Sequence, residues 1–118
     1  MEKVAIVVPA YNEEKRIGRM LDSYSSYFDN LNKKNILDYE ILVVINNTKD
    51  GTERIVKDFE ANYKNIKHLN FKKGGKGFAI MEGFKDSLKR NNSFIGFVDA
   101  DLATPPMAFY YLINSLNK

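Results

Sequence analysis

The sequence predicts an α/β fold in which a doubly wound, mostly parallel sheet lies between two layers of helices. Four short runs of apolar, largely β-branched or aromatic residues alternate with four longer segments whose apolar residues recur at helical spacing. Most of the short runs lack the polar–apolar alternation of half-exposed strands, which indicates strands covered on both faces. Strands that alternate with helices form parallel sheets with right-handed crossovers. We therefore expect four βα units in one three-layer domain.

The first unit begins with a continuous β-branched run from Lys3 to Val8, which Pro9 ends. Asn12 is a favourable helix N-cap, so we expect a helix to follow it. The apolar face of that helix is predicted by the helical spacing of Ile17, Met20, Leu21 and Tyr24. The polar interval from Asp29 to Asp38 is typical of a connector to the next strand.

The second and third units repeat this pattern. A second strand is predicted from Tyr39 to Ile45, and the turn at Asp50-Gly51-Thr52 leads into a helix with the apolar residues Ile55, Val56, Phe59 and Tyr63. A shorter strand with partial alternation runs from Ile66 to Phe71. The loop from Lys72 to Gly77 then leads into a helix whose apolar face we expect to consist of Phe78, Met81, Phe84 and Leu88.

The fourth unit contains Phe94 to Leu102, an apolar run, predicted to be a buried strand, that ends in the carboxylates of Asp99 and Asp101. Ionised carboxylates beside a core cost several kcal/mol unless something compensates them. Residues i and i+2 of an extended strand point to the same side, so both groups could bind one Mg²⁺ or Mn²⁺ ion. In the alternative, Asp99 ends the strand and Asp101 caps the helix that begins at Pro105-Pro106.

Polar or glycine-rich segments follow all four predicted strands. In doubly wound sheets, ligands bind beyond the carboxyl ends of the strands, where the strand order reverses. We therefore predict a ligand site on the rim formed by Pro9 to Glu13, Asn46-Asn47, Gly74 to Gly77 and Asp99 to Asp101. Within it, Tyr11 either packs against the protein or contacts a flat base by stacking or hydrogen bonding.

The glycines around Lys76 have two interpretations, a loose anion site made of backbone N–H groups or a plain turn. The specific phosphate-binding motifs are absent. Gly77 follows Lys76 where a Walker loop requires Ser or Thr, and Ile80 stands where a dinucleotide motif requires its third glycine. These differences argue against an ATPase or a conventional nucleotide-dependent dehydrogenase.

The composition limits the possible functions further. The 118 residues, 44% hydrophobic and 28% charged, are typical of one soluble globular domain. Without cysteine there are no disulfides, thiolate zinc sites or cysteine nucleophiles, and the single histidine, His68, excludes a multi-histidine metal cage. A net charge of +3 without a reader motif argues against nucleic-acid binding. With no signal peptide or membrane-spanning run, we expect a cytoplasmic protein.

Taken together and in this order, the motifs resemble a known family. Val7-Val8-Pro9-Ala10-Tyr11-Asn12-Glu13-Glu14, then Asp50-Gly51-Thr52, then Gly75-Lys76-Gly77, then Val98-Asp99-Ala100-Asp101 with Pro105-Pro106 resemble the nucleotide-sugar-binding part of family 2 glycosyltransferases with the GT-A fold. Within that family, the chain is most similar to the dolichyl- or polyprenyl-phosphate mannose and glucose synthases. The resemblance covers nearly all of the sequence.

The resemblance implies roles for particular residues. It places the donor, a UDP or GDP sugar, in a pocket that includes Pro9, Ala10, Tyr11, Glu13, Asn46, Lys76 and Ala100. Asp99 and Asp101 would be the catalytic DxD pair, which contacts the ribose and holds the Mg²⁺ or Mn²⁺ ion that bridges the diphosphate. Such an ion would offset the charge that develops on the leaving nucleoside diphosphate.

The sequence also departs from the family pattern. Ile45-Asn46 stands where the family commonly has an Asp-Asp pair, and Ala103 stands where a glutamine is common in the mannose synthases. Family members also continue into an acceptor-binding part. We therefore expect residues 1–118 to be a donor-binding domain, truncated before that part, of an enzyme that transfers a hexose to a polyprenyl or dolichyl phosphate. That enzyme is expected at the cytoplasmic membrane face; the alternative is a non-catalytic nucleotide-sugar-binding or partner-binding module.

Overall fold

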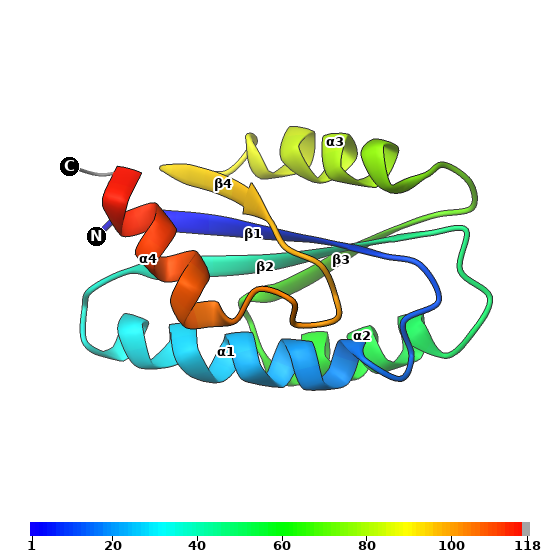
Figure 1. Cartoon of the computed structure of the whole chain (residues 1–118), viewed down its shortest axis with the longest axis horizontal. Helices are drawn as coiled ribbons and strands as arrows, with labels where there is room; N and C mark the ends of the chain where they lie inside the picture. Colours follow the sequence, from blue (N-terminus) through cyan, green and yellow to red (C-terminus); the bar gives the residue numbers. More distant parts are fainter. Residues whose placement is uncertain (117–118) are drawn as a thin grey trace.

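The computed structural model describes residues 1–116 and contains one four-stranded sheet. The strands are β1 (Lys3–Ala10), β2 (Asp38–Asn46), β3 (Ile66–Phe71) and β4 (Phe94–Phe97), and all neighbours pair in parallel in the order β3-β2-β1-β4. The chain winds outward from β1 to β3 and then crosses to the other side of β1 to form β4 (Figure 1). The strand order therefore reverses between β1 and β4, and the predicted parallel α/β sheet is confirmed.

Helices cover both faces of the sheet, as predicted. Helices α1 (Ile17–Lys33) and α2 (Thr52–Asn62) lie on one face with α4 (Pro106–Leu116), whereas α3 (Lys76–Ser87) covers the other face alone (Figure 1). The side chains of β1 alternate between these layers: Val4, Ile6 and Val8 belong to the larger core with α1, and Val7 belongs to the smaller core under α3. This alternation explains the continuous apolar run, because both sides of β1 are buried.

The first helix differs from the prediction at both ends. It extends to Lys33, into the segment that was predicted to be a connector, because Phe28 and Leu31 continue its apolar face and are buried. Asn12 is not its N-cap, since the helix begins only at Ile17. Asn12 instead adopts a left-handed backbone conformation with φ of 49°, and its Oδ1 accepts a hydrogen bond from the Lys49 backbone N–H.

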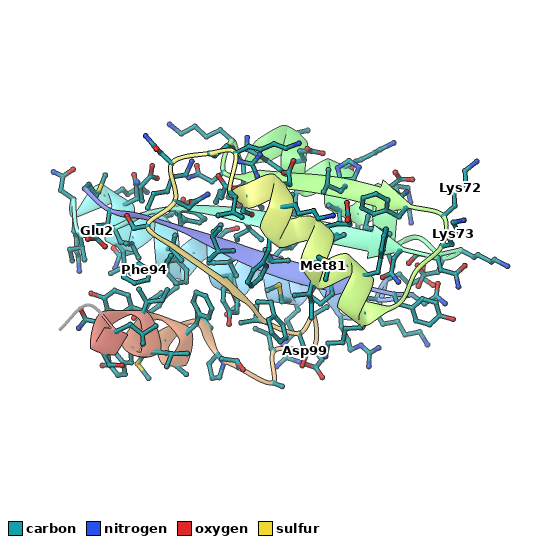
Figure 2. The ribbon with its side chains drawn as sticks, turned by 90° about the horizontal axis from the view of Figure 1, so that it is seen from above. Glu2, Lys72, Lys73, Met81, Phe94 and Asp99 are labelled. Carbon is teal, nitrogen blue, oxygen red and sulfur yellow. The ribbon has the colours of Figure 1, made fainter. Side chains whose placement is uncertain are left out.

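The predicted apolar face of α3 is wrong for three of its four residues. Phe78, Met81 and Leu88 are 41%, 60% and 73% exposed, and Met81 is labelled in Figure 2, which looks onto this helix. The buried face consists of Ala79, Gly83 and Ser87, with Phe84 packed beside them. A Cβ atom on Gly83 would lie 2.5 Å from Cγ1 of Val7. The helix therefore lies so close to the sheet that small residues, not large apolar ones, form its contact face.

The fourth strand is shorter and less buried than expected. It ends at Phe97, which is 46% exposed, and it lies at an edge of the sheet. One further ladder-like bond joins the Val98 N–H to the carbonyl oxygen of Val7, after which the chain turns at Ala100 and Asp101. Helix α4 then begins at Pro106, in agreement with the predicted proline-initiated helix.

A buried ionic network lies near the amino end of the sheet. Glu40 of β2 is 1% exposed, and its carboxylate accepts hydrogen bonds from Arg90 Nε at 2.8 and 2.9 Å and lies 3.0 Å from Lys3 Nζ. Arg90 also contacts Asp86 at 2.8 Å. The network joins β1, β2 and the end of α3, so it fixes the segment that leads into β4.

Candidate functional site

A concave cavity of about 470 Å³ lies at the carboxyl end of the sheet, where the strand order reverses. Segments that follow or end all four strands meet at it. Its lining residues are Pro9, Ala10, Tyr11, Glu13, Asn46, Asn47, Gly74, Gly75, Lys76, Asp99 and Ala100. The structure therefore brings together every residue proposed for the donor pocket. Of the predicted rim, Asn12, Gly77 and Asp101 are not among the lining residues.

The loop after β1 forms one wall, and the β2–α2 loop holds it in place. The Asn12 N–H donates to Thr48 Oγ1 at 3.2 Å, and the Glu13 N–H donates to Thr52 Oγ1 at 2.8 Å. These bonds satisfy backbone groups that no helix or strand would satisfy. Tyr11, between β1 and these contacts, is 55% exposed at the mouth of the cavity, so its ring is accessible to a ligand.

Asp50 organises the same pair of loops. One of its oxygens accepts bonds from the hydroxyl and the N–H of Thr52, and the other accepts the Glu14 N–H at 3.2 Å. Burial alone would raise the pKa of Asp50, but the hydrogen bonds from Thr52 and Glu14 outweigh burial and lower it. The sequence predicts Asp50-Gly51-Thr52 as a turn and as part of the family resemblance, but not as the link between these two loops. The Asp-x-Thr spacing, which favours local side-chain bonds to the backbone, was the signal for this larger role.

The glycine loop forms the opposite wall. Gly74 has φ of +113°, a conformation that favours glycine, and the ring of Phe78 occupies the space where a Cβ would lie. The Asn46 side-chain Nδ2 donates to the Gly74 carbonyl oxygen at 2.6 Å. A Cβ atom on Gly75 or Gly77 would meet nothing within 4 Å, so the backbone there is open to an approaching ligand. Helix α3 begins immediately afterwards, at Lys76.

Lys76 and Asp99 face each other at the cavity. Lys76 Nζ lies 2.6 Å from Asp99 Oδ1, and both side chains are about half exposed. Lys76 Nζ is also 6.0 Å from the centre of the Phe97 ring. Figure 2 labels Asp99 in the loop after β4, close to the first turn of α3. The contact therefore joins the start of α3 to the loop after β4. Because both side chains are about half exposed, each can exchange its partner for another charged group.

Asp101 has a different environment from Asp99. It is exposed, and its Oδ1 accepts a hydrogen bond from the Ala103 N–H at 2.9 Å. The premise that both carboxylates lie on one extended strand is wrong, because the strand ends at Phe97 and the chain turns at Ala100 and Asp101. Asp101 does not cap α4 either: its bond stabilises the turn before that helix. The buried hydroxyl of Tyr24 fixes the same connection by donating to the Thr104 carbonyl oxygen at 2.6 Å.

The described residues do not form a complete metal site by themselves. Across residues 1–116, no cluster of three or more His, Cys, Asp or Glu side chains could by itself hold a metal ion.

Within residues 1–116, no helix combines the length and the apolar character that crossing a membrane requires.

Comparison with known sequences identifies related proteins. The sequence model described as Glycosyl transferase family 2 matches residues 5–118. Dolichyl-phosphate beta-glucosyltransferase ALG5D of Trichomonas vaginalis is 38% identical over 117 residues, which are 98% of this chain and 35% of that protein. The dolichyl-phosphate beta-glucosyltransferase of Homo sapiens is 35% identical over 107 residues, 87% of this chain and 32% of that protein. The chain thus spans about a third of the length of these curated relatives.

Solved structures share the fold. Residues 1–349 of S. aureus TarS match with a TM-score of 0.74 and 24% identity, covering 99% of this chain and 32% of the other. Glucosyl-3-phosphoglycerate synthase from Mycobacterium tuberculosis, in complex with UDP, matches with a TM-score of 0.71 and 22% identity, covering 98% of this chain and 40% of the other. A second structure of that synthase contains Mn²⁺, UDP and glucosyl-3-phosphoglycerate. These likenesses confirm the predicted GT-A type of fold.

Proposed function

The chain belongs to glycosyl transferase family 2, and from this membership we propose that its cavity binds a nucleoside diphosphate sugar as the donor for hexose transfer. The observation that carries the proposal is the meeting of segments from all four strands at one cavity, where Lys76 and Asp99 face each other. The size supports it as well, since ligand pockets usually measure roughly 300–1,000 Å³.

The walls of the cavity offer groups suited to each part of such a donor. Exposed Tyr11 presents an aromatic ring for a base, and Glu13 offers an acceptor for hydroxyl or N–H groups. The open backbone around Gly75 and the ammonium group of Lys76 suit a diphosphate at the start of α3. When a diphosphate binds, Lys76 gains a second anionic partner besides Asp99. The exposed ion pair costs little to rearrange, because such pairs are worth only about 0–1 kcal/mol.

Asp99 and Asp101 are the residues that would hold a Mg²⁺ or Mn²⁺ ion. Their carboxylate oxygens fit this group, because Mg²⁺ is usually bound by one or two carboxylates together with waters and substrate phosphates. We propose that waters and the donor phosphates complete the coordination of the ion. A divalent ion there would offset negative charge on the leaving diphosphate. The structure of a synthase with the same fold contains Mn²⁺ together with UDP, which supports a divalent ion beside the donor.

The acceptor is proposed from the relatives. Those reported above are named as dolichyl-phosphate glucosyltransferases, so we propose that the hexose goes to a polyprenyl or dolichyl phosphate. Residues 1–118 would then supply the donor-binding domain. The acceptor-binding groups would lie in a part that corresponds to the two thirds of the relatives that this chain does not match. The enzyme would then work at the cytoplasmic face of a membrane, which would present the lipid acceptor.

Calorimetry and a transfer assay test this function. We expect UDP or GDP and their sugars to bind to the 118-residue chain more tightly with Mn²⁺ than without it. No metal-dependent binding to any of these nucleotides would contradict the proposed donor site. Labelled sugar should appear on polyprenyl phosphate only slowly with this chain and faster with a form that includes the acceptor-binding part. Donor binding without any transfer in either form would favour a non-catalytic nucleotide-sugar-binding module.

A further inference from the structure

Asn46 is a buried polar residue in the wall of the donor cavity. It is the last residue of β2 and is 3% exposed. Its Nδ2 donates a hydrogen bond of 2.6 Å to the carbonyl oxygen of Gly74, which lies 28 residues further along the chain. We propose that Asn46 is a positioning residue that fixes the glycine loop and thereby places Lys76 for the diphosphate. This inference rests on the proposed donor-binding function.

The bond acts at the point where the loop changes direction. Gly74 has a positive φ, and Gly75 is extended before α3 begins at Lys76. Only one residue therefore separates the bonded carbonyl from Lys76. Packing of the Phe71 and Phe78 rings, 5.1 Å apart between centres, holds the apolar side of the loop. The open space around Gly75 and Gly77 offers no comparable support on the cavity side, where the Asn46 bond lies.

The contact requires a hydrogen-bond donor at position 46. An amide provides one, whereas an ionised carboxylate has only acceptors. Aspartate at this position would therefore place a negative charge against the Gly74 carbonyl oxygen. The charged groups around the same cavity are Glu13, Lys76 and Asp99, and Lys76 is already paired with Asp99. A carboxylate at position 46 would add a competing partner for Lys76 as well as breaking the bond to the loop.

The alternative role predicts the opposite effect of the same substitution. If residue 46 accepted a hydrogen bond from the base, an aspartate would serve at least as well as asparagine, because charge-assisted hydrogen bonds are stronger than neutral ones. Asn46→Asp therefore separates a residue that positions the loop from a residue that contacts the base.

Hydrogen exchange of the ligand-free protein tests the loop contact directly. The Ala79 amide reports on the loop, because it is buried and donates to the Gly75 carbonyl oxygen at 3.0 Å. At pH 7.5 we expect Asn46→Asp to accelerate exchange of this amide by roughly tenfold, as expected from loss of one buried hydrogen bond. Near pH 4 a protonated aspartic acid can donate again, so the difference from the parent protein should shrink. Asn46→Ala should loosen the loop equally at both pH values. Unchanged loop exchange in both variants would overturn the proposal.

Asn47→Asp is the matched charge control. Asn47 lines the same cavity, but its contact with the neighbouring strand is made by its backbone N–H, which donates to the Phe71 carbonyl oxygen at 2.9 Å. The Asn47→Asp variant should therefore show hydrogen exchange in the loop close to that of the parent protein. Equal acceleration in Asn47→Asp would show that charge, and not the lost bond, loosens the loop, and this result would also overturn the proposal.

Binding of UDP and GDP in the presence of Mn²⁺ completes the test. For the nucleotide that the parent protein binds, we expect Asn46→Asp to weaken binding by roughly tenfold at pH 7.5, because Lys76 is no longer held in place. Unchanged or tighter binding would show that residue 46 contacts the base, which contradicts the positioning role. If the parent protein bound neither nucleotide, the proposed function would fail, while the exchange data would still decide whether Asn46 holds the loop.

Discussion

The two ends of the sheet use the same kind of charged contact for different purposes. At the amino end, the Glu40 carboxylate is 1% exposed and contacts Arg90 and Lys3. At the carboxyl end, Lys76 and Asp99 lie as close to each other, at 2.6 Å, but both are about half exposed. Charges in water exchange partners at little cost, whereas charges in a core do not. The contact at the amino end is therefore suited to stabilising the fold, and the contact at the carboxyl end is suited to exchanging partners, as the proposed donor site requires.

The pKa values of Glu40 and Arg90 reflect their contact at the amino end of the sheet. Burial alone would raise the pKa of Glu40, but hydrogen bonds from Arg90 and Lys3 outweigh it and lower the pKa. The same contact with Glu40 raises the pKa of Arg90. Both shifts favour the charged forms, so the network remains ionised in the folded protein over the neutral pH range. Breaking it, in contrast to breaking the contact at the cavity, should affect folding.

The largest expected effect comes from removing one partner of the buried network. Arg90→Met leaves the carboxylate of Glu40 buried with only Lys3 beside it, and we expect a loss of about 3 kcal/mol in the free energy of unfolding. Urea unfolding measures this loss. Lys85→Met is the matched control, since Lys85 lies 3.3 Å from Glu82 on the exposed side of α3. Its expected change is about 0.5 kcal/mol or less. Equal losses in both variants would remove the distinction between buried and exposed pairs.

The second effect concerns the metal ion that is proposed to bind at the carboxyl end of the sheet. Asp101→Ala should abolish the enhancement of nucleotide binding by Mn²⁺, because it removes one of the two proposed carboxylate ligands. The same variant should keep its fold, since it loses only an exposed bond to the Ala103 N–H, worth about 1 kcal/mol. Calorimetry with and without Mn²⁺ provides the measurement, and Asp58→Ala, on the exposed side of α2, is the control. Unfolding of Asp101→Ala at room temperature would instead assign the residue a structural role.

The third effect separates a positioned charge from general attraction. Lys76→Met should weaken nucleotide binding by about tenfold, the loss of one charge-assisted hydrogen bond, and leave stability nearly unchanged. Lys73→Met removes an equal charge from the same loop, but Lys73 is exposed and is not a lining residue of the cavity (Figure 2). Titration with the nucleotide compares the two. Equal weakening by both substitutions would indicate that the net positive charge of the loop, and not the position of Lys76, attracts the donor.

The contrast between the two ends also explains which features the sequence could predict. The strands and the carboxyl-end rim follow from local signals, since each apolar run is followed directly by its polar segment. The Glu40–Arg90 contact joins residues 50 positions apart, and Glu40 lies within a run predicted from its apolar neighbours. The contact face of α3 was missed because the close approach to the sheet selects small residues such as Gly83, which hydrophobic periodicity does not detect. Contacts that depend on the distance between elements were therefore not predictable.

The smallest expected effect is a difference in pH dependence between the parent protein and Glu40→Gln. A carboxyl group whose pKa is lower in the folded state stabilises the fold above its unfolded pKa, near 4.5, and this contribution is lost as the pH falls through the folded pKa. Urea unfolding between pH 7 and pH 3 should therefore show a steeper loss of stability for the parent protein than for Glu40→Gln. The difference should be modest, because Arg90 and Lys3 remain as donors to a protonated carboxyl group. Parallel curves would mean that the network at the amino end does not depend on the charge of Glu40, and the two ends of the sheet would then differ in burial alone.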